Sequence, residues 1–132
     1  LVFTPELYRC GVNIAGVTDI DTFIKRPEAQ TRASRVWATH AIGDVKREKE
    51  QLEEVSPLNH VDRIQAPVFL AYGGQDERVP ISQGKRLAEE LRKHGKSFEL
   101  MVKDEEGHGF LREENRIEFY RRVDAFLKEH LK

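Results

Sequence analysis

The sequence predicts an α/β domain with about three mostly parallel strands flanked by helices. The apolar run from Val68 to Tyr72 is bounded by Pro67 and by the pair Gly73-Gly74, which is typical of a parallel strand covered on both faces. Strand-like and helix-like segments then alternate along the chain, a pattern typical of a parallel sheet joined by right-handed crossovers. The length of 132 residues fits one domain with its own core.

The first half of the chain gives fewer signals. Residues 1–10 are apolar enough to predict the end of a helix, and the β-branched run 11–17 between glycines predicts a buried strand. Residues 18–60 show no single period. We expect an irregular excursion there with helical pieces, one of which Pro57 brings to an end.

Residues 61–132 are predicted to form a strand, a helix, a second strand and a second helix. The helix after the Val68 strand is expected to have Ser82 as its N-cap and Gly95 as its C-terminal stop. Its buried stripe is predicted to contain Leu87, Ala88 and Leu91.

The second strand and the last helix are predicted from two different periods. The segment SFELMVK alternates, with Phe98, Leu100 and Val102 on one face, which favours a strand near an edge of the sheet. Residues 113–131 have the spacing of a helix. The apolar positions that predict its buried face are Ile117, Tyr120, Val123, Leu127 and Leu131.

Composition excludes several classes of partner. The 22 basic and 23 acidic residues nearly cancel and form no block, so we expect no nucleic acid and no anionic membrane surface as partner. A single cysteine, Cys10, excludes an internal disulfide framework and favours a reducing, cytoplasmic location. No apolar run approaches the roughly 18 residues of a membrane span. Because the chain begins without methionine, we expect it to be a piece of a longer protein.

Two residues stand where parallel sheets carry their chemistry. Asp76 and His108 each follow the carboxyl end of a predicted strand, and the two strands are joined by one helix, so the side chains are expected to be neighbours. A carboxylate that accepts a hydrogen bond from one imidazole nitrogen fixes the tautomer and stabilises the imidazolium. In α/β-hydrolases the chain order is nucleophile, acid, histidine, and these residues fit the last two places.

Three stretches resemble the catalytic domain of prolyl-oligopeptidase-type serine peptidases, a group that includes acylaminoacyl-peptidases and dipeptidyl-peptidases. They are SPLNHVDRIQAPVFLAYGGQDERVP, DEEGHGF and ENRIEFYRRVDAFLKEHL, and the resemblance extends over nearly the whole chain from TPELYRCGVNIAGVTD. It implies the C-terminal portion of an α/β-hydrolase fold, a partial catalytic domain in residues 1–132. It also implies that Asp76 is the triad carboxylate, that His108 is the triad base, and that no cofactor or metal takes part.

The resemblance also implies substrate contacts. Arg78 and Val79 match positions that approach the substrate in the family, and so does the strand end at Val17 and Thr18. A solvated surface arginine is an equal alternative for Arg78. Trp37, in the excursion, is expected either to line a substrate pocket or simply to pack.

The chain departs from the family pattern in one large respect. The family nucleophile lies in a G-x-S-x-G turn, and none of the four serines here, Ser34, Ser56, Ser82 and Ser97, lies in such a turn. We therefore expect the nucleophile and the oxyanion-hole donors upstream of residue 1. The isolated chain is expected to be inactive, although its parent would hydrolyse peptide bonds.

Other interpretations remain open at this stage. An esterase on the same scaffold would use the same triad, and a non-catalytic segment would only bind or assemble. A metal cluster of residues 104–106 with His108 is a weaker alternative, because adjacent acids are more often solvated. Cys10 as a nucleophile is also weaker than a packing role. The strand at residues 11–17 is expected to leave an apolar edge, which favours homo-oligomers or edge-strand pairing.

Overall fold

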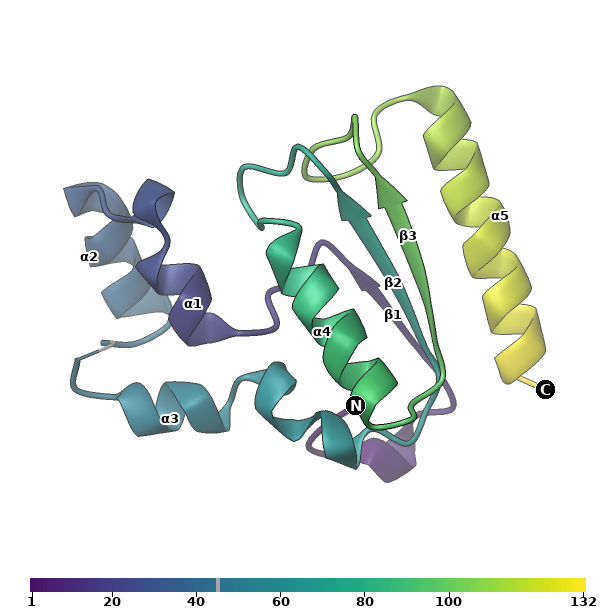
Figure 1. Cartoon of the computed structure of the whole chain (residues 1–132), viewed down its shortest axis with the longest axis horizontal. Coiled ribbons are helices and arrows are strands. Elements are labelled where there is room, and N and C mark those ends of the chain that lie inside the picture. The colour runs from purple at the N-terminus through teal and green to yellow at the C-terminus, as the bar shows by residue number, and fades with distance from the viewer. Residues whose placement is uncertain (45) are drawn as a thin grey trace.

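The computed structural model describes residues 1–44 and 46–132 and contains one three-stranded sheet (Figure 1). Its strands are β1 (Gly11–Ile14), β2 (Val68–Gly73) and β3 (Phe98–Lys103), in the order β1-β2-β3. Both pairs are parallel, with Gly11 opposite Val68 and Val68 opposite Phe98. The predicted α/β class and the parallel sheet are confirmed.

Helices connect and flank these strands. The α-helices are α1 (Ile20–Lys25), α2 (Arg32–Ala41), α3 (Lys49–Glu54), α4 (Ser82–Lys93) and α5 (Glu113–His130). Three 3₁₀ segments are η1 (Pro5–Leu7), η2 (Pro27–Ala29) and η3 (Pro57–Arg63). No helix in the described part of the chain is both long and apolar enough to cross a membrane.

The central strand β2 is buried along its whole length because α4 covers one face of it and α5 covers the other (Figure 1). Val68, Leu70 and Tyr72 point to the α4 side, where they pack with Leu87 and Leu91. The alternate residues Phe69 and Ala71 join a second cluster on the α5 side, with Met101, Phe119 and Phe126. Alternate residues of the continuous apolar run thus pack into two separate cores, as expected for a strand covered on both faces.

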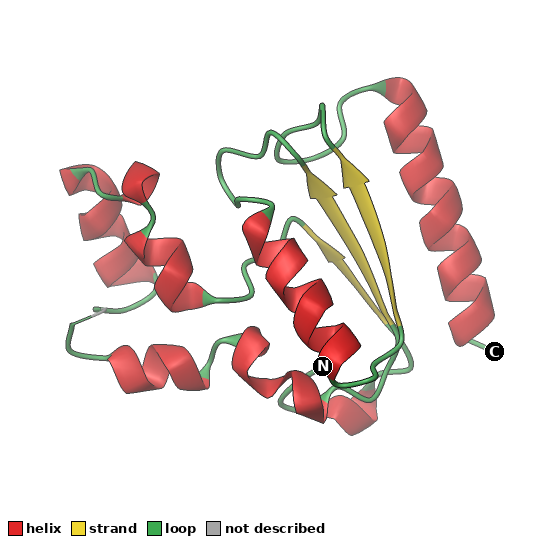
Figure 2. Ribbon diagram, in the orientation of Figure 1, coloured by secondary structure: helices red, strands yellow, loops and turns green. Residues whose placement is uncertain are grey.

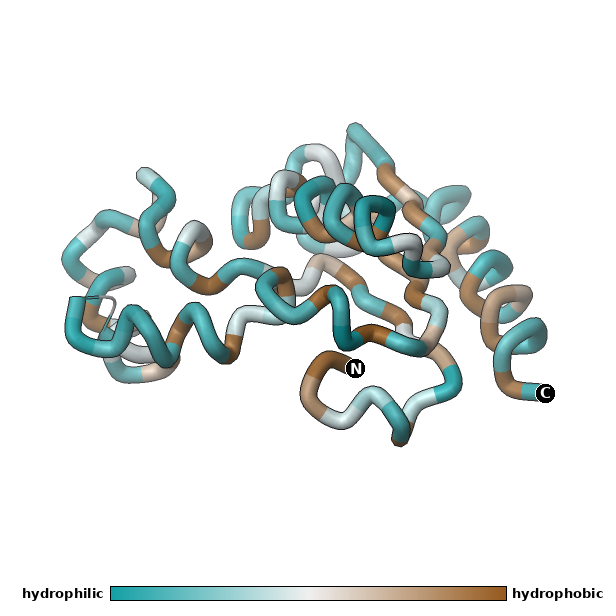
Figure 3. Tube along the Cα trace, turned by 60° about the horizontal axis from the view of Figure 1, so that its bottom comes forward, coloured by the Kyte–Doolittle hydropathy of each residue, from teal (hydrophilic) through white to brown (hydrophobic). Residues whose placement is uncertain are grey.

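The excursion between β1 and β2 has its own small core and extends away from the sheet (Figure 3). Its helices α1, α2 and α3 meet through Ile24, Ala38 and Leu52. The prediction of an irregular region with helical pieces is confirmed for residues 18–44 and 46–60. Its last α-helix ends at Glu54, before Pro57, as predicted.

Two predicted boundaries in the first 17 residues were wrong. Residues 1–10 contain only the three-residue turn η1, which begins at Pro5 and ends because Tyr8 is extended (φ −117°, ψ 133°). The strand stops at Ile14 rather than at Val17, because Ala15 adopts a positive φ of 47°. The Asn13 side chain accepts a hydrogen bond from the Gly16 N–H at 3.0 Å and so stabilises that turn.

Ser82 does not cap α4, contrary to the prediction. The preceding residue, Ile81, already has helical angles (φ −53°, ψ −22°), so Ser82 is the first residue of the helix and its hydroxyl makes no capping bond. The C-terminal stop is confirmed, since Gly95 has a φ of +63° and its N–H donates to the Arg92 carbonyl. The predicted stripe of Leu87, Ala88 and Leu91 is buried.

The buried face of α5 differs from the predicted one. Val123 and Leu127 do contact the core, but Ile117, Tyr120 and Leu131 are exposed, by 43 %, 64 % and 58 %. The residues that the helix buries against β2 are Phe119 and Phe126. Apolar side chains stand on two faces of this helix, and the period alone does not decide which face meets the sheet.

Candidate active site

The loops that follow β2 and β3 meet beyond the carboxyl ends of the strands (Figure 2). Asp76 lies on the first loop and His108 on the second, 32 residues apart in sequence. The imidazole Nδ1 of His108 lies 2.8 Å from Oδ2 of Asp76. The structure therefore brings together the two side chains that the sequence placed at neighbouring strand ends.

The Asp76 carboxylate is held rigidly. Its side chain is fully buried, and its Oδ1 accepts hydrogen bonds from the backbone N–H groups of Arg78 and Val79, both at 2.8 Å. The second oxygen is left for the imidazole. Because a carboxylate oxygen accepts, Nδ1 of His108 carries the proton, and in the neutral ring Nε2 carries the lone pair.

The free nitrogen of His108 faces outward. The side chain is 38 % exposed, and Nε2 makes no hydrogen bond to any residue that the structure describes. An oriented imidazole with one anchored and one accessible nitrogen is suited to accept and return a proton. None of the four serines of the chain has a hydrogen bond to this ring among the described contacts, and the buried Ser56 hydroxyl donates to the Leu52 carbonyl instead.

Two glycines allow the loops to approach so closely. A Cβ atom at Gly73 would overlap the carbonyl oxygens of Glu106 and Gly107, and one at Gly74 would lie 2.6 Å from the Asp104 Cα. Backbone bonds then join the loops, since Gln75 N–H donates to the Glu106 carbonyl at 2.9 Å. The Gly-Gly pair thus does more than form a turn, because it lets the histidine loop pack against the aspartate loop.

Replacing Gly73 with alanine should therefore displace the histidine loop. The clash is with backbone atoms that cannot rotate away, so we expect the fold to lose roughly 3 kcal/mol of stability, at the upper end for overpacking. Chemical denaturation of the Gly73→Ala variant would measure the loss. Gly107→Ala is the matched control, because the nearest atom to its new Cβ is 3.9 Å away. Equal stability of the two variants would contradict the argument.

The four residues implied as substrate contacts lie in different surroundings. Arg78 is exposed and its guanidinium makes no ion pair with the residues described, whereas the Val79 side chain is buried in the core on the α4 side. Val17 packs against that same core. Thr18 is 1 % exposed, and its hydroxyl donates to the Gln83 carbonyl at 2.9 Å, so its side chain is engaged inside the protein.

Gln83 is a buried polar residue that the sequence analysis missed. Its Oε1 accepts from the N–H groups of Thr18 and Asp19 at 2.9 and 2.8 Å, which ties the start of the excursion to α4. Burial of Gln83 could have been inferred from its place one turn before Leu87 on the buried stripe. Nearby, the Tyr72 hydroxyl donates to the Gly16 carbonyl, and burial raises the pKa of Tyr72 to about 12.

Trp37 and the acidic run also have defined positions. Trp37 is 59 % exposed and lines an apolar hollow of about 320 Å³ between α1 and α2, together with Phe23 and Ile24. Among the residues that the structure describes, no three His, Cys, Asp or Glu side chains gather as metal ligands would. The Glu106 carboxylate points to backbone N–H groups instead.

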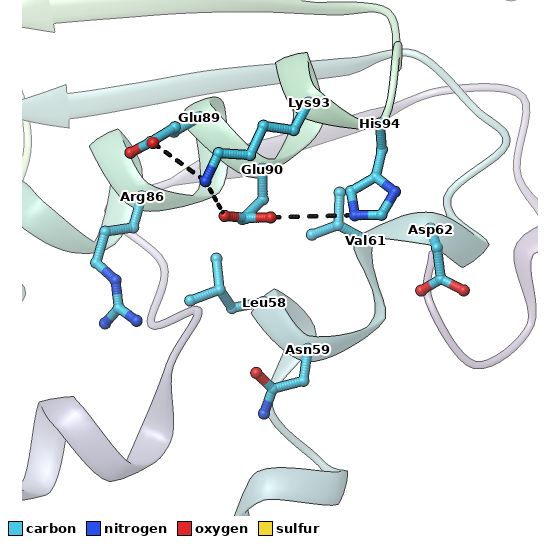
Figure 4. Close-up of a pocket in the computed structure, with 9 residues that line it drawn as sticks. All are labelled: Leu58, Asn59, Val61, Asp62, Arg86, Glu89, Glu90, Lys93 and His94. Atoms are coloured by element: carbon cyan, nitrogen blue, oxygen red, sulfur yellow. Dashed lines mark hydrogen bonds and ion pairs between the residues drawn. The ribbon is translucent and has the colours of Figure 1, made fainter.

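A polar hollow of about 540 Å³ lies elsewhere, between α4 and η3 (Figure 4). Lys93 is its central cation, and its Nζ lies 2.8 Å from Glu90 Oε1 and 3.1 Å from Glu89 Oε1. Neither Asp76 nor His108 lines this hollow. This hollow is therefore separate from the paired carboxylate and imidazole.

Comparison with known proteins agrees with this geometry. The family model described as the prolyl oligopeptidase family matches residues 1–132, the whole chain. The chain belongs to the prolyl oligopeptidase family. The relationship that the sequence motifs suggested is thereby confirmed, and so is the α/β-hydrolase type of fold.

Relatives within the prolyl oligopeptidase family extend the comparison. The dipeptidyl aminopeptidase BIII of Pseudoxanthomonas mexicana is 28 % identical over 133 residues, which is 99 % of this chain and 19 % of that protein. A puromycin-hydrolyzing peptidase of Mycobacterium tuberculosis superposes with a TM-score of 0.86 at 24 % identity, over 98 % of this chain and 19 % of that one. An acylaminoacyl peptidase bound to a chloromethyl ketone superposes with a TM-score of 0.84 at 23 % identity, over 99 % of this chain and 21 % of that one. The chain thus spans about a fifth of the length of these relatives.

Proposed function

We propose that this chain supplies the acid and the base of a catalytic triad in a serine peptidase. The observation that carries the proposal is the hydrogen bond between His108 and the buried Asp76 at adjacent strand ends, in a member of the prolyl oligopeptidase family. The serine would come from residues outside this chain, because none of its four serines has a hydrogen bond to the His108 ring among the described residues. The substrate would be a peptide, and neither a cofactor nor a metal is needed.

Each residue would have a distinct role in the reaction. His108 Nε2 would take the proton of the serine hydroxyl as its oxygen attacks the substrate carbonyl, and would then pass that proton to the leaving amine. Water would attack the resulting acyl-enzyme with His108 again as base, releasing the acid and restoring the serine. Asp76 would hold the imidazole in the required tautomer and stabilise the imidazolium.

Arg78 is the residue that we propose to contact substrate directly, since it is exposed and its backbone N–H binds Asp76. The other three residues would support the substrate site without exposing their side chains to it. They are Val79 and Val17, which pack against the core, and Thr18, which is buried. We also propose a cytoplasmic location, which the single cysteine, Cys10, supports.

A labelling experiment tests the assignment of the nucleophile. A fluorophosphonate probe forms a covalent adduct with an activated serine, so the isolated chain should show no change in intact mass. The full-length polypeptide that contains the chain should gain one adduct. A stoichiometric adduct on Ser34, Ser56, Ser82 or Ser97 would overturn the proposal, because the nucleophile would then lie within this chain.

The triad alone does not distinguish peptide from ester substrates. Rates of the full-length polypeptide on aminoacyl-nitroanilides and on short acyl esters would separate the two. A peptidase should retain substantial kcat/KM on the amide, which has the poorer leaving group. Turnover of the esters alone would assign an esterase, and turnover of neither would favour a binding segment.

We also propose that another strand pairs with the outer edge of β1. Among the described residues this strand pairs only with β2, and Val12 and Ile14 on it are 37 % and 52 % exposed. Open edges of this kind associate with other strands. The isolated chain should therefore sediment as a dimer or a larger species, and Ile14→Lys should shift it toward monomer. A wild-type chain that is monomeric and fully soluble would contradict this expectation.

A further inference from the structure

The acidic run before His108 contains one residue that differs from its neighbours. Glu106 is only 2 % exposed, whereas Asp104 and Glu105 lie at the surface. A carboxylate is rarely buried unless hydrogen bonds replace its hydration. The hydrogen-bond partners of Glu106 therefore show which parts of the structure its buried carboxylate joins.

The carboxylate of Glu106 binds the beginning of α5. Oε2 accepts from the Leu111 N–H at 2.9 Å, and Oε1 accepts from the Arg112 N–H at 2.9 Å and from the Asn115 Nδ2 at 2.8 Å. Arg112 occupies the N-cap position and its side chain makes no capping bond, so Glu106 supplies the missing acceptor from outside the helix. Hydrogen bonds from Asn115 and from the Leu111 N–H lower the pKa of Glu106, so the group is ionised at neutral pH.

The backbone of Glu106 binds the other side of the site. Its carbonyl accepts from the Gln75 N–H at 2.9 Å, next to Asp76, and its N–H donates to the Lys103 carbonyl at 3.1 Å. Glu106 thus bonds to the end of β3, to the aspartate loop and to α5. His108 lies within the short segment between Glu106 and Leu111. The backbone bonds of Glu106 hold one end of that segment, and its carboxylate holds the other.

We propose that Glu106 is the positioning residue for His108. By fixing the loop 106–111 at both ends, it holds the imidazole where Nδ1 reaches Asp76 and Nε2 faces the substrate. The flanking residues Gly107 and Gly109 have no side chains that could hold His108 in place, and Gly109 has a φ of +128°. Phe110 packs against Phe119, and the Glu106 carboxylate fixes the backbone that directly follows Phe110. This inference rests on the proposed function, because it assigns Glu106 its part in the same triad.

The decisive variant is Glu106→Gln in the full-length polypeptide. Glutamine has nearly the same shape, but its NH₂ group would face a backbone N–H, donor against donor, so one anchor of the loop is lost. We expect kcat to fall roughly 10- to 100-fold with KM changed less than about twofold, as for a misplaced catalytic group. The downfield proton resonance of the imidazole Nδ1–H bonded to Asp76 should also broaden or disappear.

Asp104→Asn is the matched control. It removes the same charge from the same loop, but the Asp104 carboxylate makes no hydrogen bond to the described residues, so kcat and the Nδ1–H resonance should remain as in wild type. Asn115→Ala removes only one of the three donors to Glu106 and should lower kcat less than Glu106→Gln, again without raising KM. If Glu106→Gln proves too unstable to assay, the Asn115→Ala variant still tests the contribution of the Glu106 carboxylate to kcat.

The outcomes separate this inference from the proposed function. If His108→Ala is inactive while Glu106→Gln and Asn115→Ala keep wild-type kcat and the downfield resonance, the positioning role is wrong and the triad stands. If Asp104→Asn loses as much kcat as Glu106→Gln, the effect is one of charge and the inference again fails. If His108→Ala retains full activity, the proposed function itself is overturned.

Discussion

Replacing His108 with alanine should abolish hydrolysis by the full-length polypeptide, lowering kcat by roughly 10⁶-fold, as loss of a triad base does elsewhere. The imidazole is the only group that the described structure places with one nitrogen on Asp76 and the other exposed, so no neighbour can take over the proton transfer. Its removal also leaves Oδ2 of the buried Asp76 without its partner, so the free energy of unfolding should fall by about 1–3 kcal/mol. Steady-state kinetics and a thermal melt of the same preparation would measure the two effects.

His94→Ala is the appropriate control for this variant. His94 is also partly exposed, but it lies at the C-terminal end of α4, beside Glu90 and at the opposite end of the sheet from the carboxyl ends of the strands. Its replacement should leave kcat as in wild type. Appreciable activity in a folded His108→Ala protein would show that another residue is the base.

Replacing Asp76 with asparagine should lower kcat by roughly 10⁴-fold while the protein remains folded. The asparagine carbonyl can still accept from the N–H groups of Arg78 and Val79, so its NH₂ group must face Nδ1 of His108. A donor at that place forces the proton of the neutral ring onto Nε2, which can then no longer accept the serine proton. The defect is thus one of tautomer rather than of packing.

Glu77→Gln gives a close comparison for Asp76→Asn. It removes an equal charge from the adjacent position, where the side chain is exposed and makes no hydrogen bond to the described residues. Its kcat should be within about twofold of wild type, as for surface charges in high dielectric. An equal loss in both variants would mean that net charge near the site, and not the orientation of the imidazole, controls the rate.

Sequence patterns were most informative where burial is uniform. The strand at Val68 could be placed because both of its faces are covered and Pro67 and Gly73 mark its ends. The juxtaposition of Asp76 and His108 followed from strand order alone, since one crossover separates the loops on which they lie. These features depend on local signals and on the rules of parallel sheets.

Other features depend on contacts between distant segments, which a period does not reveal. The buried face of α5 is decided by Phe119 and Phe126 meeting β2, although Ile117 and Tyr120 fit a helical stripe equally well. Glu106 looks like any member of an acidic run until α5 presents its N–H groups to it. Gln83 likewise acquires its role only when the excursion returns to α4.

The single crossover between the loops of Asp76 and His108 has a consequence for how this pair of residues can be inherited and rebuilt. Asp76 and His108 lie within one uninterrupted stretch from β2 to the end of the loop after β3, with no part of the excursion between them. The excursion can therefore be lengthened, exchanged or cut without separating the pair. For the engineer, this makes residues 18–60 the natural place to divide such an enzyme into two complementing halves.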